Sequence, residues 1–125
     1  MDQNDKIAAL TEGFAASAGM LAAIGNETRQ HLILEMLKAG DCSGMRVGKI
    51  ARRTNLSRTA VSHHLRVLMD AGIVKVRKEG TKNYYYFDPE MNSFEKLVST
   101  LRLAAEMTKE LSGRRDEAFA REIQI

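Results

Sequence analysis

The sequence contains little cysteine, proline or tryptophan. Its 125 residues include one cysteine (Cys42), one proline and no tryptophan. A single cysteine excludes an internal disulfide and is typical of a reducing compartment. One proline leaves room for long helices, which the abundant alanine, leucine and methionine favour.

Long hydrophobic runs are also scarce. The longest, about residues 15–24, is shorter than the roughly 20 residues that cross a bilayer. The first residues, MDQNDK, include acids where a secretory signal carries bases. We therefore expect a cytoplasmic protein with no membrane partner.

Positive charge is concentrated in the middle of the chain, which is long enough for one domain. Between residues 46 and 82 there are ten Lys/Arg and two Asp/Glu, whereas the remainder holds nine Lys/Arg and fourteen Asp/Glu. A basic centre between acidic flanks indicates that the centre binds a polyanion. The alternative is a charged surface that only contacts water.

Two terminal segments carry apolar residues at alternating spacings of three and four. They span residues 5–24, ending at Gly25, and residues 90–111, starting after Asp88 or Pro89. Such seams predict helices that pack against other helices. The pattern is lost after residue 111, so residues 113–125 are predicted to be a tail, either a frayed extension of the helix or disordered.

A helix is predicted over residues 27–39. Asn26 can cap its start and Gly40 its end. Its predicted buried stripe consists of Leu32, Ile33, Met36 and Leu37.

Two further helices are predicted over residues 46–71. A short one covers residues 47–54, the letters NLS form a tight turn, and Ser57 caps a helix that ends at Gly72. Two short helices joined in this way form a helix-turn-helix.

The helix that follows Ser57 divides into two faces at about 100° per residue. Its inner face holds Val61, His64, Leu65 and Leu68, and its outer face holds Arg58, Thr59, Ser62, His63 and Arg66. The adjacent histidines therefore point apart and cannot form the i, i+4 pair of a chelating or catalytic site. We expect His64 at the margin of the core, bonded to a backbone group, and His63 on the polar face.

Residues 73–87 are predicted to form a β-hairpin. β-Forming residues flank a turn at Glu79-Gly80, and basic residues lie near its tip. Side chains alternate across a strand, and we expect Tyr85 and Phe87 on the core side.

This arrangement suits the major groove of DNA. Arg58 is predicted to contact guanine, Thr59 a thymine methyl group, and Ser62 and His63 bases or phosphates. Cations of the hairpin add attraction that is independent of sequence and weakened by salt. The predicted DNA contacts are Ser57, Arg58, Thr59, Ser62, His63, Arg66, Arg77, Lys78 and Lys82.

Three stretches carry a resemblance to a known family: LAAIGNETRQHLILEML, LSRTAVSHHLRVLMDAGIVKVRKEG and YYYF. With them, residues 21–87 resemble the winged helix-turn-helix core of the ArsR/SmtB family of bacterial transcriptional regulators. The most specific part holds Ser62, His64-Leu65, Leu68 and Ala71-Gly72, and is similar to the family run S-x-H-L-x-x-L-x-x-A-G-L-V.

The resemblance implies a mainly α fold with a small β-hairpin, as one winged helix-turn-helix domain over residues 1–112 with terminal dimerisation helices. It also implies a homodimer that binds palindromic operator DNA, usually as a repressor. The dimer interface implied by the terminal helices includes Leu10, Phe14, Leu21, Leu97, Leu101 and Ala104.

The metal sites of the family are not expected here. Arg46 and Gly48 stand where members with a C-V-C run have thiolates, and residues 88–111 contain no histidine. Cys42 alone cannot form a dithiol switch. We therefore expect no metal and no cofactor, and the sequence does not indicate an effector.

Two other functional classes fit the sequence less well. A winged helix can instead bind an acidic protein partner, but the outer face of the Ser57 helix is small, polar and basic, which favours DNA. An enzyme is not expected, because the sequence has no Gly-rich phosphate loop, no H-E-x-x-H motif and no nucleophile with a partnered base.

Overall fold

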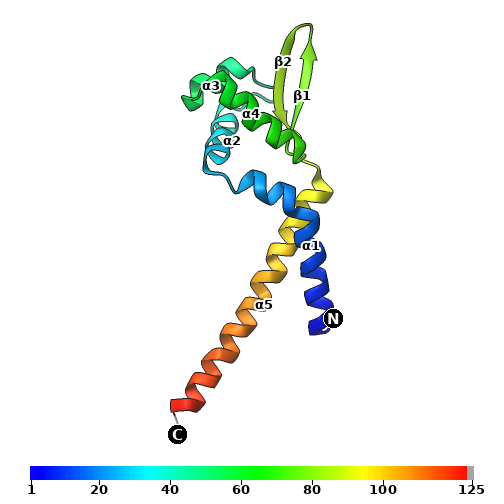
Figure 1. The fold of residues 1–125 in the computed structure, drawn as a ribbon, viewed down its shortest axis with the longest axis vertical. Helices are drawn as coiled ribbons and strands as arrows, with labels where there is room; N and C mark the ends of the chain where they lie inside the picture. The colour runs from blue at the N-terminus through cyan, green and yellow to red at the C-terminus, as the bar shows by residue number, and fades with distance from the viewer. Residues whose placement is uncertain (124–125) are drawn as a thin grey trace.

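The computed structural model describes residues 1–123 of the chain. Five helices and one hairpin follow in the order α1 (Gln3–Ile24), α2 (Glu27–Ala39), α3 (Val47–Thr54), α4 (Arg58–Asp70), β1 (Val74–Glu79), β2 (Lys82–Phe87) and α5 (Met91–Ile123). In Figure 1, α2, α3, α4 and the hairpin form a compact upper part, and α1 and α5 run downward from it. The architecture is the predicted mainly helical fold with one antiparallel hairpin.

Local capping explains where the helices begin and end. The Asn26 side chain accepts a hydrogen bond from the Arg29 N–H, and Gly40 ends α2 with a φ of 68°. These caps confirm the predicted bounds of α2. Asp2, which was not predicted as a cap, forms a capping box with Asp5 and starts α1 two residues before the predicted position.

The core lies where α2, α3 and α4 meet the base of the hairpin. Its largest fully buried side chains are Leu32, Ile50, Val61, Leu65, Leu68 and Val74. Tyr85 and Phe87 pack against this core, as predicted. Leu37 does not belong to it: the side chain is 59% exposed, so its assignment to the buried stripe of α2 is wrong. It follows buried Met36 directly and therefore lies on the outer side of the helix.

Helices α1 and α5 lie side by side and antiparallel (Figure 1). Ion pairs join Lys6 to Glu110 and Glu12 to Lys96 along their length. Buried Gly13 of α1 faces buried Thr100 of α5. The lack of a side chain at Gly13 leaves room for Thr100 at the contact with α5.

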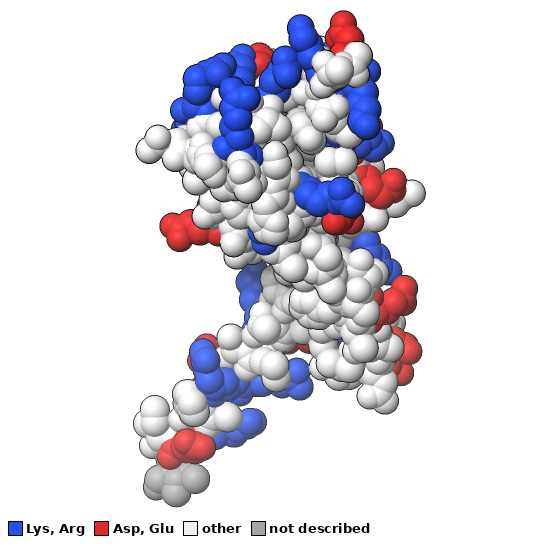
Figure 2. All heavy atoms as spheres, turned by 45° about the horizontal axis from the view of Figure 1, so that its top comes forward, with Lys and Arg blue, Asp and Glu red and all other residues white. Residues whose placement is uncertain are grey.

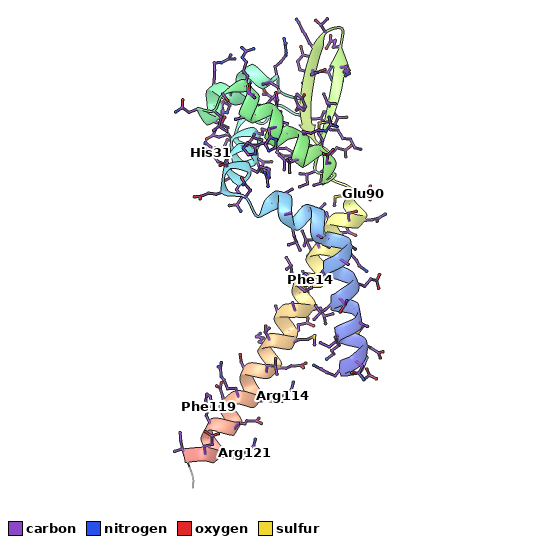
Figure 3. All side chains as sticks on the ribbon, viewed as in Figure 1. Phe14, His31, Glu90, Arg114, Phe119 and Arg121 are labelled. Atoms are coloured by element: carbon purple, nitrogen blue, oxygen red, sulfur yellow. The ribbon has the colours of Figure 1, made fainter. Side chains whose placement is uncertain are left out.

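Helix α5 continues well beyond residue 111. It is helical through Ile123, so the predicted tail is a helical extension, and only residues 124–125 of that segment lie outside the described residues. Figure 3 shows Arg114, Phe119 and Arg121 on these turns, past the start of α1. The apolar pattern stops where the side chains of residues 113–123 are mostly exposed, whereas Arg, Glu and Ala still favour helix.

Helix α1 is long and apolar enough, by length and composition alone, to cross a membrane. The prediction that no segment is long enough to cross a bilayer considered only the run at residues 15–24 and not the whole of α1. Its face around Gly13 and Met20 packs within the chain, Leu21 and Ile24 pack against the core, and Ile7 and Phe14 are exposed.

Candidate nucleic-acid interface

The turn between α3 and α4 sets the direction of the α4 helix. Asn55 takes the left-handed conformation, with a φ of 57°, and ends α3. The Ser57 hydroxyl then accepts a hydrogen bond from the Ala60 N–H at 3.1 Å, which confirms Ser57 as the N-cap. The first turn of α4 is therefore held in place by the sequence that precedes it.

The two faces of α4 are divided as predicted. Val61, Leu65 and Leu68 have no exposed surface. The opposite face, which is exposed, consists of Arg58, Thr59, Ser62, His63 and Arg66. Helix α4 therefore presents a polar, cationic face to solvent.

The two histidines have different surroundings. The His63 ring is exposed, and the half-buried His64 ring meets it edge-on with centroids 5.4 Å apart. The Nδ1 atom of His64 lies 3.4 Å from Nη1 of Arg29 in α2. The expectation of a backbone partner for His64 is therefore wrong, because the partner is the Arg29 side chain.

Arg29 connects three helices. Its Nε donates to the Ala23 carbonyl at 2.7 Å and its Nη2 to the Ala22 carbonyl at 3.1 Å, both at the end of α1. Burial, and then the positive charges of Arg29 and His63, lower the pKa of His64. The His64 imidazole is consequently neutral near pH 7 and accepts a hydrogen bond from Arg29, which fits a structural role.

The hairpin extends the basic surface beside α4. Lys and Arg side chains gather at the end of the molecule formed by the hairpin and the neighbouring helices (Figure 2). Lys78 and Lys82 are exposed. Arg77 stacks over the Tyr84 ring at 4.5 Å and forms an ion pair with Glu79, so part of its charge is neutralised within the hairpin.

A groove separates α4 from the hairpin. It has a volume of about 380 Å³ and is lined by Ser62, Arg66, Met69, Val76, Lys78, Asn83 and Tyr85. Predicted DNA contacts from α4 and from the hairpin therefore face a common groove.

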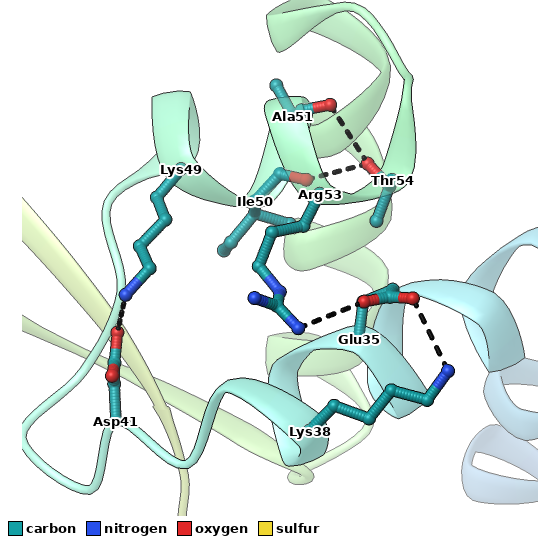
Figure 4. A network of polar contacts seen from close by, with 8 residues as sticks. All are labelled: Glu35, Lys38, Asp41, Lys49, Ile50, Ala51, Arg53 and Thr54. Atoms are coloured by element: carbon teal, nitrogen blue, oxygen red, sulfur yellow. Dashed lines mark hydrogen bonds and ion pairs between the residues drawn. The ribbon is translucent and has the colours of Figure 1, made fainter.

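A polar network holds α3 in position next to α2 (Figure 4). Arg53 pairs with Glu35 of α2 at 3.2 Å, and Glu35 also binds Lys38. Lys49 pairs with Asp41 in the loop before α3. These cations of α3 have acidic partners within the chain.

Arg46 and Arg52 are not among the predicted DNA contacts. Both side chains line a second cleft, together with Arg58 of α4. The outward position of Arg52 on α3 was visible in the sequence. The sequence did not show that the Arg58 side chain lies against α3.

The predicted dimer residues differ in exposure. Phe14 is 43% and Leu101 46% exposed, whereas Leu97 is 6% exposed and belongs to the core of the chain itself. Leu10, Leu21 and Ala104 are half-buried. Phe14 and Leu101 therefore have the most surface left for a partner.

Comparison with known proteins identifies the family. The sequence profile of the bacterial regulatory proteins of the arsR family matches residues 28–76, from α2 into β1. An uncharacterized HTH-type transcriptional regulator of Methanocaldococcus jannaschii is 40% identical over 91 residues, which are 72% of this chain and 99% of that protein. The chain belongs to the ArsR family.

Other ArsR-family comparisons agree in sequence and in fold. The transcriptional repressor SdpR of Bacillus subtilis is 40% identical over 63 residues, half of this chain and 66% of that protein. The crystal structure of an ArsR-like transcriptional regulator from Rhodococcus superposes with a TM-score of 0.65 at 27% identity, covering 88% of this chain and 96% of that one. This ArsR-family chain is a DNA-binding transcriptional regulator and not an enzyme.

Proposed function

We propose that this ArsR-family regulator is a homodimeric repressor that binds a palindromic operator in the cytoplasm and works without the metal sites of the family. The observation that carries the proposal is the exposed outer face of α4 next to the basic hairpin.

The outer face of α4 has the dimensions and chemistry for base recognition. The major groove is about 12 Å wide and admits one helix with its side chains. Thr59, Ser62 and His63 are exposed in the first turns, where a recognition helix contacts base edges. We assign base contacts to these three side chains.

The hairpin and the C-terminal part of α4 supply contacts to the DNA backbone. Arg66 and Lys78 line the groove between α4 and the hairpin, and Lys82 is exposed at the start of β2. Their contacts with phosphates are sequence-independent and weaken as salt rises.

The proposed dimer explains the exposed apolar residues of α1 and α5. Phe14, Val98 and Leu101 are each at least 40% exposed and form no part of the chain's core. Pairing two copies around a two-fold axis would cover them. The operator of such a dimer has two half-sites about one helical turn apart, or a multiple of it.

We infer that the protein does not sense a metal, because other residues stand where the family's metal-binding thiolates would be. Arg46 and Gly48 occupy the positions of the family's thiolates, and neither side chain can bind a metal as a thiolate does. Within residues 1–123, no three His, Cys, Asp or Glu side chains form a group suited to a metal ion.

Selection of bound sequences from random duplex DNA tests the proposal. We expect a palindromic consensus and a particle of dimer mass, with affinity for the selected duplex that falls steeply as salt rises. His63→Ala should lower this affinity. At the base that His63 contacts, discrimination against the other bases should fall by about 1–3 kcal/mol. His31→Ala is the matched control, because His31 is an exposed histidine on α2.

Failure to bind any duplex at low salt would overturn the proposal and favour an acidic protein partner. Equal DNA affinity of the His63→Ala and His31→Ala variants would show that His63 does not contact the operator.

A further inference from the structure

A second cleft lies between α3, the start of α4 and β2. Its volume is about 570 Å³, and its lining includes Arg46, Gly48, Arg52, Arg58 and Asn83. It is separate from the groove between α4 and the hairpin, although Asn83 lines both. This cleft is bordered by cations from two helices.

The charges of the cleft are unbalanced. Arg46, Lys49, Arg52 and Arg58 line it, and Asp41 is its one acidic residue. Asp41 is already paired with Lys49. In the described chain, residues 1–123, Arg46, Arg52 and Arg58 form no ion pair, so a bound anion would meet three uncompensated guanidinium groups.

Two of these guanidinium groups converge over Gly48. A Cβ atom on Gly48 would lie 3.0 Å from Nη2 of Arg58 and 3.5 Å from Nη1 of Arg52. Glycine thus leaves room for Arg58 to fold back from α4 onto α3. A guanidinium presents its N–H donors as a planar fork that matches the oxygens of a phosphate group.

We propose that this cleft binds one phosphodiester group of the DNA backbone, with Arg52 and Arg58 donating to its non-bridging oxygens. The inference rests on the proposed DNA binding and assigns Arg58 a role different from the predicted guanine contact. Arg58 holds the protein in register on the duplex, and the bases are left to Thr59, Ser62 and His63.

Salt-dependent binding tests this assignment. The affinities of wild type, Arg52→Ala and Arg58→Ala are measured by fluorescence anisotropy at several salt concentrations, on the selected operator and on an unrelated duplex. Log K falls as log salt rises, and losing one phosphate contact should reduce the magnitude of this slope by about 0.9. The reduction applies once for every cleft that binds DNA. Both duplexes should lose affinity by the same factor, so the ratio of the two affinities stays that of wild type.

Arg53→Ala is the matched control. Arg53 neighbours Arg52 on α3 and carries the same charge, but it pairs with Glu35 and does not line the cleft. We expect its salt slope to stay close to that of wild type. Circular dichroism melting of all variants confirms that each is folded.

Two results would overturn the inference while leaving DNA binding intact. If Arg52→Ala and Arg58→Ala had the salt slope of Arg53→Ala, the cleft would hold no backbone phosphate. If Arg58→Ala lost affinity for the operator alone, Arg58 would read a base. A wild type that binds no duplex would instead refute the proposed function, and this inference with it.

A free phosphorylated ligand is the other source of the same chemistry. Calorimetric titration of the DNA-free protein with inorganic pyrophosphate distinguishes the two sources. We expect no saturable binding, because one phosphodiester on DNA is held in place by contacts elsewhere on the duplex. Saturable binding that Arg52→Ala removes, with DNA affinity unchanged, would assign the cleft to a small ligand and overturn the DNA inference.

Discussion

Replacing Gly13 by alanine should destabilise the pairing of α1 and α5. A Cβ atom at this position would lie 2.1 Å from Oγ1 and 2.9 Å from Cγ2 of Thr100. Rotating the threonine exchanges one clashing branch for the other. Its hydroxyl also donates to the Lys96 carbonyl at 2.7 Å, and the residue is 4% exposed. The added methyl group is therefore accommodated only if the helices separate.

Gly19→Ala supplies the reference for the size of this effect. Gly19 lies on the same helix, and among residues 1–123 no neighbouring atom lies within 4 Å of its added Cβ. Alanine in place of glycine stabilises an exposed helix by about 1 kcal/mol, and both variants share this gain. The difference between the two variants therefore isolates overpacking, which costs about 1–3 kcal/mol. We expect the upper end of that range, because both branches of Thr100 clash.

Urea and thermal denaturation at one protein concentration measure the difference. For a chain of this size, about 3 kcal/mol corresponds to a gap of roughly 10 °C in Tm between Gly19→Ala and Gly13→Ala. Adding Thr100→Ala to Gly13→Ala should recover part of the loss, since it removes both clashing atoms. A Gly13→Ala variant as stable as Gly19→Ala would refute the packing argument.

Three further predictions concern α4 and the proposed dimer. Because the pKa of His64 is lowered in the folded protein, the unfolded chain binds this proton more readily, so the free energy of unfolding should fall as pH drops below about 6.5. Urea denaturation at pH 5.5 and 7.5 should show a smaller fall for His64→Gln than for wild type or His31→Gln. Phe14→Glu combined with Leu101→Glu should yield folded monomers by light scattering, and an unchanged mass would place the interface elsewhere. Ser57→Ala should cost about 1 kcal/mol in urea denaturation through loss of the N-cap, and no loss would contradict that role.

The features predicted correctly from the sequence are those with local causes. Ser57, Asn26 and Gly40 act within a few residues of themselves, so their sequence neighbourhood is enough to place the helix ends. The division of α4 into two faces follows from helical periodicity and a single core.

The features that were missed depend on contacts between distant segments. Arg29 meets His64 only because α2 and α4 pack together, and no periodicity in either helix specifies that contact. The approach of Arg58 to Gly48 likewise depends on the angle between two helices. The length of α5 was missed for another reason: hydrophobic periodicity reports burial, and the last turns of this helix are largely exposed.

The extent of α5 has a practical consequence. Its 33 residues span roughly 50 Å, and its last turns lie at the opposite pole from the hairpin (Figure 1). A fluorophore or surface anchor joined near Ile123 would sit far from a duplex held at the other pole. Immobilising the protein through that site should leave nucleic acid free access, which makes it a suitable attachment point for binding kinetics on a sensor chip.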